Sequence, residues 1–154
     1  MSKRTKLNEV EIAFVHRLRA GRLATSDEQG SPHLVPVCYA FDGVRFYTPL
    51  DEKPKTVSDK RLRRVRNIEA RHEASLLIDQ YDDDWSQLGY ILIHGYAELI
   101  QPEHEAHAHA INLLRMRYQQ YRSMLLEQHP MIMITPDHIA SWGPAVRSQI
   151  LNDH

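Results

Sequence analysis

The sequence predicts a mainly β protein, a small antiparallel β-barrel of about six strands with helices at its periphery. Short segments rich in Val, Ile, Tyr and Phe follow one another along the chain, separated by turn residues. Three segments with helical periodicity do not alternate regularly with these strands, which argues against a parallel α/β sheet. Some strand segments are apolar on both faces. This favours a barrel over an α+β fold, because one face fills the interior and the other meets a helix, a cofactor or a second subunit.

The first predicted element is a short amphipathic helix that ends before Gly21. Asn8 and Glu11 have the spacing of a capping pair, and apolar residues recur at helical intervals over 12–18. Three strands then form a predicted antiparallel meander. The strands cover residues 22–26, 33–41 and 44–49. The first two are separated by a turn over 27–30, and the last two by the hairpin signal Asp42-Gly43. The middle strand is apolar on both faces, so we expect it to be covered on two sides.

The second half of the chain alternates between helical and extended patterns. A helix over 56–70 has a narrow apolar stripe at Val57, Leu62 and Val65. Strands are predicted over 74–80 and 90–100, joined by a polar loop that carries Trp85. A helix from Pro102 keeps its apolar spacing through Leu125, and residues 131–134 and 138–142 form a last strand or strand pair.

Length, net charge and cysteine content indicate a single-domain protein without a dedicated nucleic-acid or membrane surface. With 154 residues we expect one domain over 1–154, and a net charge of -1 argues against a surface dedicated to nucleic acid or anionic membrane. Cys38 is the one cysteine, so no internal disulfide can form, and we interpret it as a core residue. Without an apolar run long enough to span a membrane or form a signal peptide, the expected location is cytoplasmic.

The sharpest chemical cluster is Lys53, Lys55 and Thr56, placed where a predicted strand leads into a helix. Pro54 fixes the backbone between the two lysines, and the two ammonium groups, the hydroxyl and the helix N-terminus suit a phosphate monoester. The alternative is a solvated turn whose charges contact nothing.

The other charged clusters favour ordinary surface structure. The arginines at 61, 63, 64 and 66 lack interleaved aromatic residues, so ion pairing with Asp59, Glu69 and the acidic run 82–84 is preferred over nucleic-acid binding. A metal site at His104, His107 and His109 lacks a fourth ligand, and we predict an exposed face paired with Glu103 and Glu105.

No nucleophile elbow, Walker loop or dinucleotide fingerprint is present, and no catalytic residue can be named. Any reaction would therefore depend on a bound cofactor.

Several short motifs occur in an order that resembles the pyridoxamine 5'-phosphate oxidase-like FMN-binding split β-barrels. Within them the sequence is most similar to the small oxidoreductases that use the deazaflavin coenzyme F420. The resemblance is strong over 22–100. It is carried by Gly21-Arg22-Leu23-Ala24-Thr25, residues 27–32, His33-Leu34-Val35-Pro36-Val37, Lys53-Pro54-Lys55-Thr56, Leu62-Arg63-Arg64, residues 74–79, Asp84-Trp85-Ser86 and Gly95-Tyr96-Ala97.

The resemblance implies a split β-barrel homodimer with a flavin-type cofactor in each cleft between subunits. The cofactor phosphate would be held by Lys53, Lys55 and Thr56, and Trp85 would approach the cofactor from its own chain or from the partner. The strand along the isoalloxazine would be Leu34, Val35, Pro36 and Val37.

The leading hypothesis is an oxidoreductase that transfers hydride between F420 or FMN and a small organic substrate. The sequence does not decide between the two cofactors. A non-catalytic module that stores or carries such a cofactor is the first alternative, and a nucleic-acid-binding protein that uses residues 61–66 is the second.

Overall fold

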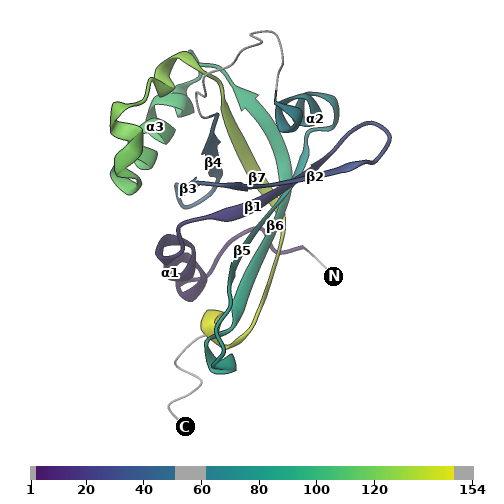
Figure 1. Ribbon diagram of the computed structural model, residues 1–154, viewed down its shortest axis with the longest axis vertical. Coiled ribbons are helices and arrows are strands. Elements are labelled where there is room, and N and C mark those ends of the chain that lie inside the picture. The colour runs from purple at the N-terminus through teal and green to yellow at the C-terminus, as the bar shows by residue number, and fades with distance from the viewer. Residues whose placement is uncertain (1–2, 51–61, 148–154) are drawn as a thin grey trace.

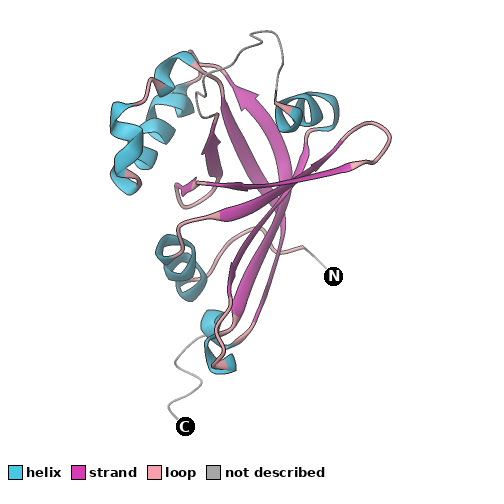
Figure 2. Cartoon of the chain, viewed as in Figure 1, coloured by secondary structure: helices cyan, strands magenta, loops and turns pink. Residues whose placement is uncertain are grey.

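The structure, a computed structural model, describes residues 3–50 and 62–147. This part of the chain forms one sheet with helices around it (Figures 1 and 2). The helices are α1 (Glu9–Arg17), α2 (Arg63–Arg71) and α3 (Glu105–Arg117), and the strands are β1 (Gly21–Ser26), β2 (Pro32–Val37), β3 (Ala40–Phe41), β4 (Phe46–Pro49), β5 (Glu73–Gln80), β6 (Gly89–Ile100) and β7 (Met131–Trp142).

The strands pair antiparallel in the order β2-β1-β5-β6-β7-β4-β3, and the sheet curls into a half-barrel (Figure 1). The predicted mainly β, antiparallel barrel with peripheral helices is therefore confirmed. The described residues contain seven strands, one more than the expected number, because the segment predicted over 33–41 is divided into β2 and β3.

Alternating residues of β7 fill two apolar clusters, one on each face of the sheet. Ile132 and Ile134 belong to the barrel interior, whereas Met131 and Met133 pack with Leu114 of α3. This alternation explains why the strand is apolar on both faces, since each face meets a different layer of the protein.

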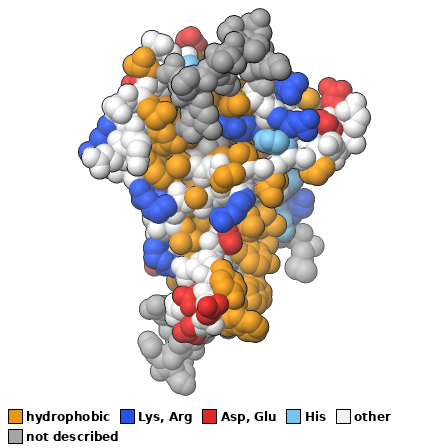
Figure 3. Space-filling model, in the orientation of Figure 1, with side chains coloured by type: hydrophobic (Ala, Val, Ile, Leu, Met, Phe, Trp, Pro, Cys, Tyr) orange, Lys and Arg blue, Asp and Glu red, His pale blue; other side chains and the backbone are white. Residues whose placement is uncertain are grey.

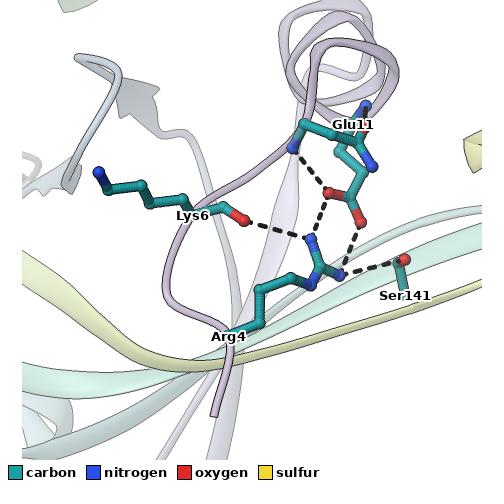
Figure 4. Close-up of polar contacts among 5 residues, drawn as sticks. Arg4, Lys6, Glu11 and Ser141 are labelled. Atoms are coloured by element: carbon teal, nitrogen blue, oxygen red, sulfur yellow. Dashed lines mark hydrogen bonds and ion pairs between the residues drawn. The ribbon is translucent and has the colours of Figure 1, made fainter. Parts of the chain in front are cut away.

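The N-terminal segment is fixed to both α1 and the sheet (Figure 4). Asn8 and Glu11 form the predicted capping box, with 2.9 Å hydrogen bonds in both directions. The buried carboxylate of Glu11 also accepts a 2.5 Å hydrogen bond from Arg4, whose guanidinium extends toward Ser141 of β7. The backbone N–H of Ile139 donates to the Arg4 carbonyl at 2.8 Å, so this segment adds to the free edge of β7.

The predicted three-stranded meander is wrong, because β2 pairs only with β1 whereas the β3–β4 hairpin pairs with β7 at the other end of the described sheet. The two turns predicted within it are confirmed. Asp27 accepts hydrogen bonds from the backbone within its turn, and Gly30 has φ +86. In the second turn, Asp42 accepts from the backbone N–H of Arg45 at 2.7 Å, and Gly43 has φ +102. Positive φ values favour glycine at both positions.

Two elements have bounds that differ in detail from the predicted ones. Of the helix predicted over 56–70, residues 56–61 lie outside the described residues and α2 begins at Arg63. Of the last strand or strand pair predicted after residue 130, the structure has the single strand β7, with an irregularity where His94 pairs with His138 but Gly95 pairs with Pro136. Pro136 has no N–H for the ladder, which is compatible with a bulge at this point.

The predicted exposed histidine face of α3 is wrong for His107, whereas His104 and His109 are exposed. His107 is 2% exposed, and its Nε2 lies 2.7 Å from the carbonyl oxygen of His129. It shares the buried face of the helix with Ala110, Ile111 and Leu114, so it packs toward the sheet. His104 instead caps the helix, since its Nδ1 accepts a hydrogen bond from the N–H of Ala106.

The helix predicted to continue through residue 125 ends early. α3 stops at Arg117 and two 3-10 turns follow. Arg115 donates to the carbonyl groups of Tyr121 and Met124, which stabilises this tighter path, and Leu125 is exposed.

Candidate cofactor-binding site

The four residues predicted to lie along a cofactor ring belong to β2, which is an edge strand in the described part of the sheet. Their side chains alternate between two faces. Val35 and Val37 face the barrel interior, whereas Leu34 is 68% exposed and Pro36 is exposed. The expectation that this strand is covered on both sides is wrong for the single chain, because the outer face of β2 has no covering element among the described residues.

Lys53, Lys55 and Thr56 lie outside the described residues. Their described flanks are the end of β4 on one side and Leu62, the N-cap residue of α2, on the other.

The N-terminus of α2 is strongly basic. Leu62 has no side chain that could cap the helix, and no acidic residue lies in the first turn, which instead carries Arg63, Arg64 and Arg66. Helix N-termini attract anions, and this one lacks the side-chain acceptor that caps α1. In Figure 3, Lys, Arg and His side chains gather in the region of α2 and the β1–β2 hairpin.

Asn67 holds α2 against the sheet. Its Nδ2 donates a buried 3.0 Å hydrogen bond to Oγ1 of Thr25 on β1. Arg71, at the other end of the helix, donates to the carbonyl of Asp27 at 3.1 Å. Between the helix and the β1–β2 turn lies a pocket of about 230 Å³, lined by Asp27, Glu28, Gln29, Arg63, Arg66, Asn67 and Ala70.

Two strand residues in the inner face of the barrel carry a buried polar atom that has no hydrogen-bond partner among the described residues. The two atoms are Nδ1 of His33 on β2 and Oγ1 of Thr48 on β4. Thr48 is 2% exposed and, by strand alternation, shares the face of Phe46, whose ring is in the barrel core. A buried hydroxyl without a partner costs free energy, so such an atom is a candidate ligand contact.

His33 lies in a positive environment. Partial burial lowers its pKa first, and the charges of Arg63 and Arg64 lower it further. The imidazole is therefore neutral near pH 7, while the arginines beside it remain charged. An anion bound here would meet cationic groups and an imidazole able to gain a proton.

Trp85 lies far from these groups within one chain. It is 70% exposed in the 3-10 turn Trp85–Gln87, just before the first residue of β6. α2 reaches the same strand at Ala97, whose N–H donates to the carbonyl of His72. Eight residues of strand separate Gly89 from Ala97, about 26 Å. A single chain therefore does not bring Trp85 to α2 (Figure 1).

Sequence reasoning did not identify His33, Thr48 or Asn67. Thr48 is a lone hydroxyl in an apolar strand shortly before Lys53, which is a signal that could have been used. The pairing of Asn67 with Thr25 depends on how α2 crosses the sheet and has no sequence signature.

Other site classes receive no support from residues 3–50 and 62–147. No group of three His, Cys, Asp or Glu side chains there could hold a metal ion. In the same residues, no helix has the length and apolar character that crossing a membrane requires.

The sequence pattern of the family described as pyridoxamine 5'-phosphate oxidase matches residues 8–143. The protein belongs to the pyridoxamine 5'-phosphate oxidase family. Its strands, α2 and the candidate site all fall within the matched range. No curated protein matches the chain.

Solved structures of similar fold carry varied descriptions. A conserved hypothetical protein from Mycobacterium tuberculosis is 24% identical with a TM-score of 0.70, over 94% of this chain and 91% of that one. The heme storage protein HutZ from Vibrio cholerae is 14% identical with a TM-score of 0.66, over 90% and 94%. An FAD-binding protein from Mesorhizobium loti is 20% identical with a TM-score of 0.61, over 92% and 97%. At these identities the likeness shows the pyridoxamine 5'-phosphate oxidase fold alone.

Proposed function

We propose that the protein is a flavin- or deazaflavin-dependent oxidoreductase, with residues 1–154 forming a single domain that binds FMN or F420. The observation that carries the proposal is the uncapped, arginine-rich N-terminus of α2 directly after the segment that contains Lys53, Lys55 and Thr56. Membership of the pyridoxamine 5'-phosphate oxidase family and the likeness to an FAD-binding protein support it.

In this proposal the phosphate of the cofactor binds Lys53, Lys55 and Thr56, and the positive end of α2 adds to its stabilisation. The described residues fit such a group, because Thr48 offers a buried hydroxyl without a partner at the end of β4. Each charge-assisted hydrogen bond contributes about 1.5 to 3 kcal/mol, so the loss of one weakens binding about tenfold to a hundredfold.

The ring of the cofactor lies along β2 in this account. Leu34, Val35 and Val37 supply backbone groups and side-chain surface, while Pro36 has no N–H and contributes packing only. When bound, the ring supplies hydride transfer to or from a small organic substrate; the protein orients both molecules and excludes water. We propose no catalytic acid or base.

A homodimer completes the site. The outer face of the sheet exposes Leu34, Tyr90, Leu92, Tyr96 and Trp142 at 68%, 37%, 37%, 49% and 52%. These five side chains expose about 500 Å², against about 800 Å² per partner in a standard interface. A second copy packed antiparallel on this face would bring its Trp85 end toward α2 of the first. This would resolve the separation of Trp85 from α2 in one chain.

A non-catalytic protein that binds or carries a flavin-type cofactor is the second candidate. It is favoured by the likeness to a heme storage protein and by a described pocket whose polar groups, such as Arg63 and Asn67, suit binding more clearly than proton transfer. Localisation in the cytoplasm remains part of either proposal.

The deciding experiment begins with the purified protein. We expect a copurified or added cofactor with the absorbance spectrum and mass of FMN or F420, and, after anaerobic reduction, reoxidation by a member of a panel of small acceptors. If the cofactor binds but no acceptor reoxidises it faster than it reoxidises free cofactor in solution, the result supports the storage function. Absence of binding by either cofactor contradicts both candidates.

A further inference from the structure

A second pocket lies against α2, and the proposed function assigns no role to it. Five residues separate Arg63, which lines the first pocket, from Ile68, which lines the second. This spacing turns the helix by about 140° beyond one full turn, so the two pockets lie on different faces of α2. The second pocket has a volume of about 390 Å³, and its lining includes Ile68, Glu69, His72, Tyr96, Glu98 and Leu99.

One wall of this second pocket is aromatic. The rings of His72 and Tyr96 stack with 5.3 Å between their centroids and 16° between their planes, and Tyr96 is 49% exposed. Ile68 and Leu99 add apolar surface, and Glu98 supplies a carboxylate that accepts hydrogen bonds. Pockets of about 300–1,000 Å³ hold compact ligands, so this one has room for an indole. Its chemistry suits an aromatic side chain that carries an N–H donor.

Trp85 is such a side chain, and the described residues of its own chain leave it uncovered. It is 70% exposed in the turn before β6. Asp84 holds this turn, because its carboxylate accepts hydrogen bonds from the N–H and the hydroxyl of Ser86 at 3.1 and 2.7 Å. The indole therefore projects from an ordered turn, and its burial would remove about 150–250 Å² of surface from water.

The loop that carries Trp85 and the helix α2 have opposite charges. Residues 81–87 contain three aspartates and no lysine or arginine, whereas α2 contains four arginines and one glutamate. In the part of the chain that the structure describes, none of these aspartates forms an ion pair with a lysine or arginine. Figure 3 shows acidic side chains at the lower end of the molecule, whereas α2 lies at the upper end in Figure 1. The pairing that the sequence predicts between the arginines and this acidic run is therefore not formed within one chain, and a second copy can supply it.

Twofold symmetry brings these two ends together. Two copies that pack their outer sheet faces with β6 antiparallel are related by an axis that runs across the strands near the middle of β6. Gly89 of one copy then lies opposite Ile100 of the other. Trp85 precedes Gly89 by four residues, and Tyr96 to Leu99 of the pocket lie within four residues of Ile100. The axis leaves positions across the sheet unchanged, and both the loop and α2 connect to β5, so the loop of each copy reaches α2 of the other.

We propose that two copies of the chain join through this contact. Loop 81–87 of each copy docks on α2 of the other, with Trp85 seated in the pocket of Tyr96 and Leu99 and the aspartates facing the arginines of the helix. The inference rests on the homodimer of the proposed function and names the residues that hold its subunits together. A second copy thus contributes a side chain beside the candidate cofactor site. Asn67 fixes α2 to its own sheet, and Trp85 of the other copy supports a different face of the helix.

The first test measures the affinity of the dimer by analytical ultracentrifugation of the full-length protein without added cofactor. The test variant is Trp85→Ala. The matched control is Tyr81→Ala, because this aromatic residue belongs to the same loop and is 71% exposed. A buried aromatic anchor carries much of the affinity of an interface, so Trp85→Ala should raise the dissociation constant about 30-fold or more, and Tyr81→Ala about threefold or less.

The second test locates the contact with substitutions at exposed positions, which leave the core unchanged. Two chains that both carry Cys38→Ala are mixed. One has Ser86→Cys, next to Trp85, and the other has Gln101→Cys, at the pocket. We expect mild oxidation to join the two different chains by a disulfide and to join neither chain to a copy of itself. In the control mixture Gln120→Cys, at an exposed residue of the turn after α3, takes the place of Gln101→Cys, and no disulfide should form.

The outcomes separate this inference from the proposed function. Equal affinities for the two loop variants overturn the inference and leave the homodimer intact. A disulfide that forms equally with the test and control cysteines, or with neither, also overturns it. A wild type that stays monomeric contradicts the homodimer as well. Failure of the same samples to bind FMN or F420 contradicts the proposed function, whereas the dimer contact is judged from the first two measurements alone.

Discussion

Asn67 of α2 donates a buried 3.0 Å hydrogen bond to Oγ1 of Thr25 on β1. This contact joins the helix that follows the segment of Lys53 and Lys55 to β1, the strand next to the edge strand β2. Both side chains are at most 5% exposed, so water cannot take the place of either one as the hydrogen-bond partner of the other. The position of the basic end of α2 therefore depends on a hydrogen bond between two uncharged side chains.

Asn67→Ala should lower the free energy of unfolding by about 1 to 3 kcal/mol, because it leaves the Thr25 hydroxyl buried without a partner. Urea denaturation measures the change. The double variant Asn67→Leu/Thr25→Val should recover part of the loss, since no polar group is then left unpaired. A single variant as stable as the wild type would contradict a structural role for this bond.

Thr48→Val should weaken cofactor binding without lowering the stability of the protein. The side chain of Thr48 is buried and its hydroxyl has no partner in residues 3–50 and 62–147, so the replacement should leave the apoprotein as stable or stabilise it slightly. If the hydroxyl contacts the cofactor, the affinity should fall about tenfold, measured by fluorescence titration. Unchanged affinity would remove Thr48 from the site.

The stability that Glu11 contributes should be lost in acid. Burial raises its pKa, but the hydrogen bond and charge of Arg4 and the bonds from Ser141 and Asn8 outweigh this, so the pKa lies below its usual 4.5. A carboxyl with a lowered folded-state pKa stabilises the protein above the unfolded value, and this stability is lost as the pH falls through the folded value.

Glu11→Gln should therefore cost about 1 kcal/mol at neutral pH and flatten the decline of thermal stability below about pH 4.5. Glu9→Gln, on the exposed side of the same helix, is the matched control. Identical pH profiles for the two variants would contradict the assigned role.

His33 should report an anion beside α2. Its pKa is lowered by partial burial and by Arg63 and Arg64, so the free protein binds its proton only below the usual 6.5. A phosphate bound next to these groups favours the imidazolium and should raise the pKa of His33. NMR titration of the imidazole with and without FMN measures this; an unchanged pKa in the loaded protein would place the phosphate elsewhere.

The sequence predicted the fold from local signals. The capping pair Asn8–Glu11, the turns at Gly30 and Gly43, and the apolar strands all have short-range causes, and all are confirmed. The burial of His107 was missed because a histidine among Glu and Ala residues looks polar. Its burial depends on which face of α3 the sheet covers.

The candidate site was less accessible to sequence reasoning. The residues of β2 form a strand as predicted, but they face two sides of the sheet, and Trp85 lies at the far end of β6. Tertiary geometry and a second subunit determine such relationships. The predicted roles of Lys53, Lys55 and Thr56 lie outside the described residues and stay predictions.

The most direct test of the central claim compares cofactors with and without their phosphate. Affinities for FMN and riboflavin, and for F420 and its phosphate-free deazaflavin, are measured for the wild type, for Lys53→Ala/Lys55→Ala and for the control Lys6→Ala. The account predicts that the double variant loses about a hundredfold in affinity for one phosphorylated cofactor and keeps its affinity for the phosphate-free form. Equal losses for both forms, or no loss for either, would contradict a phosphate held by these lysines.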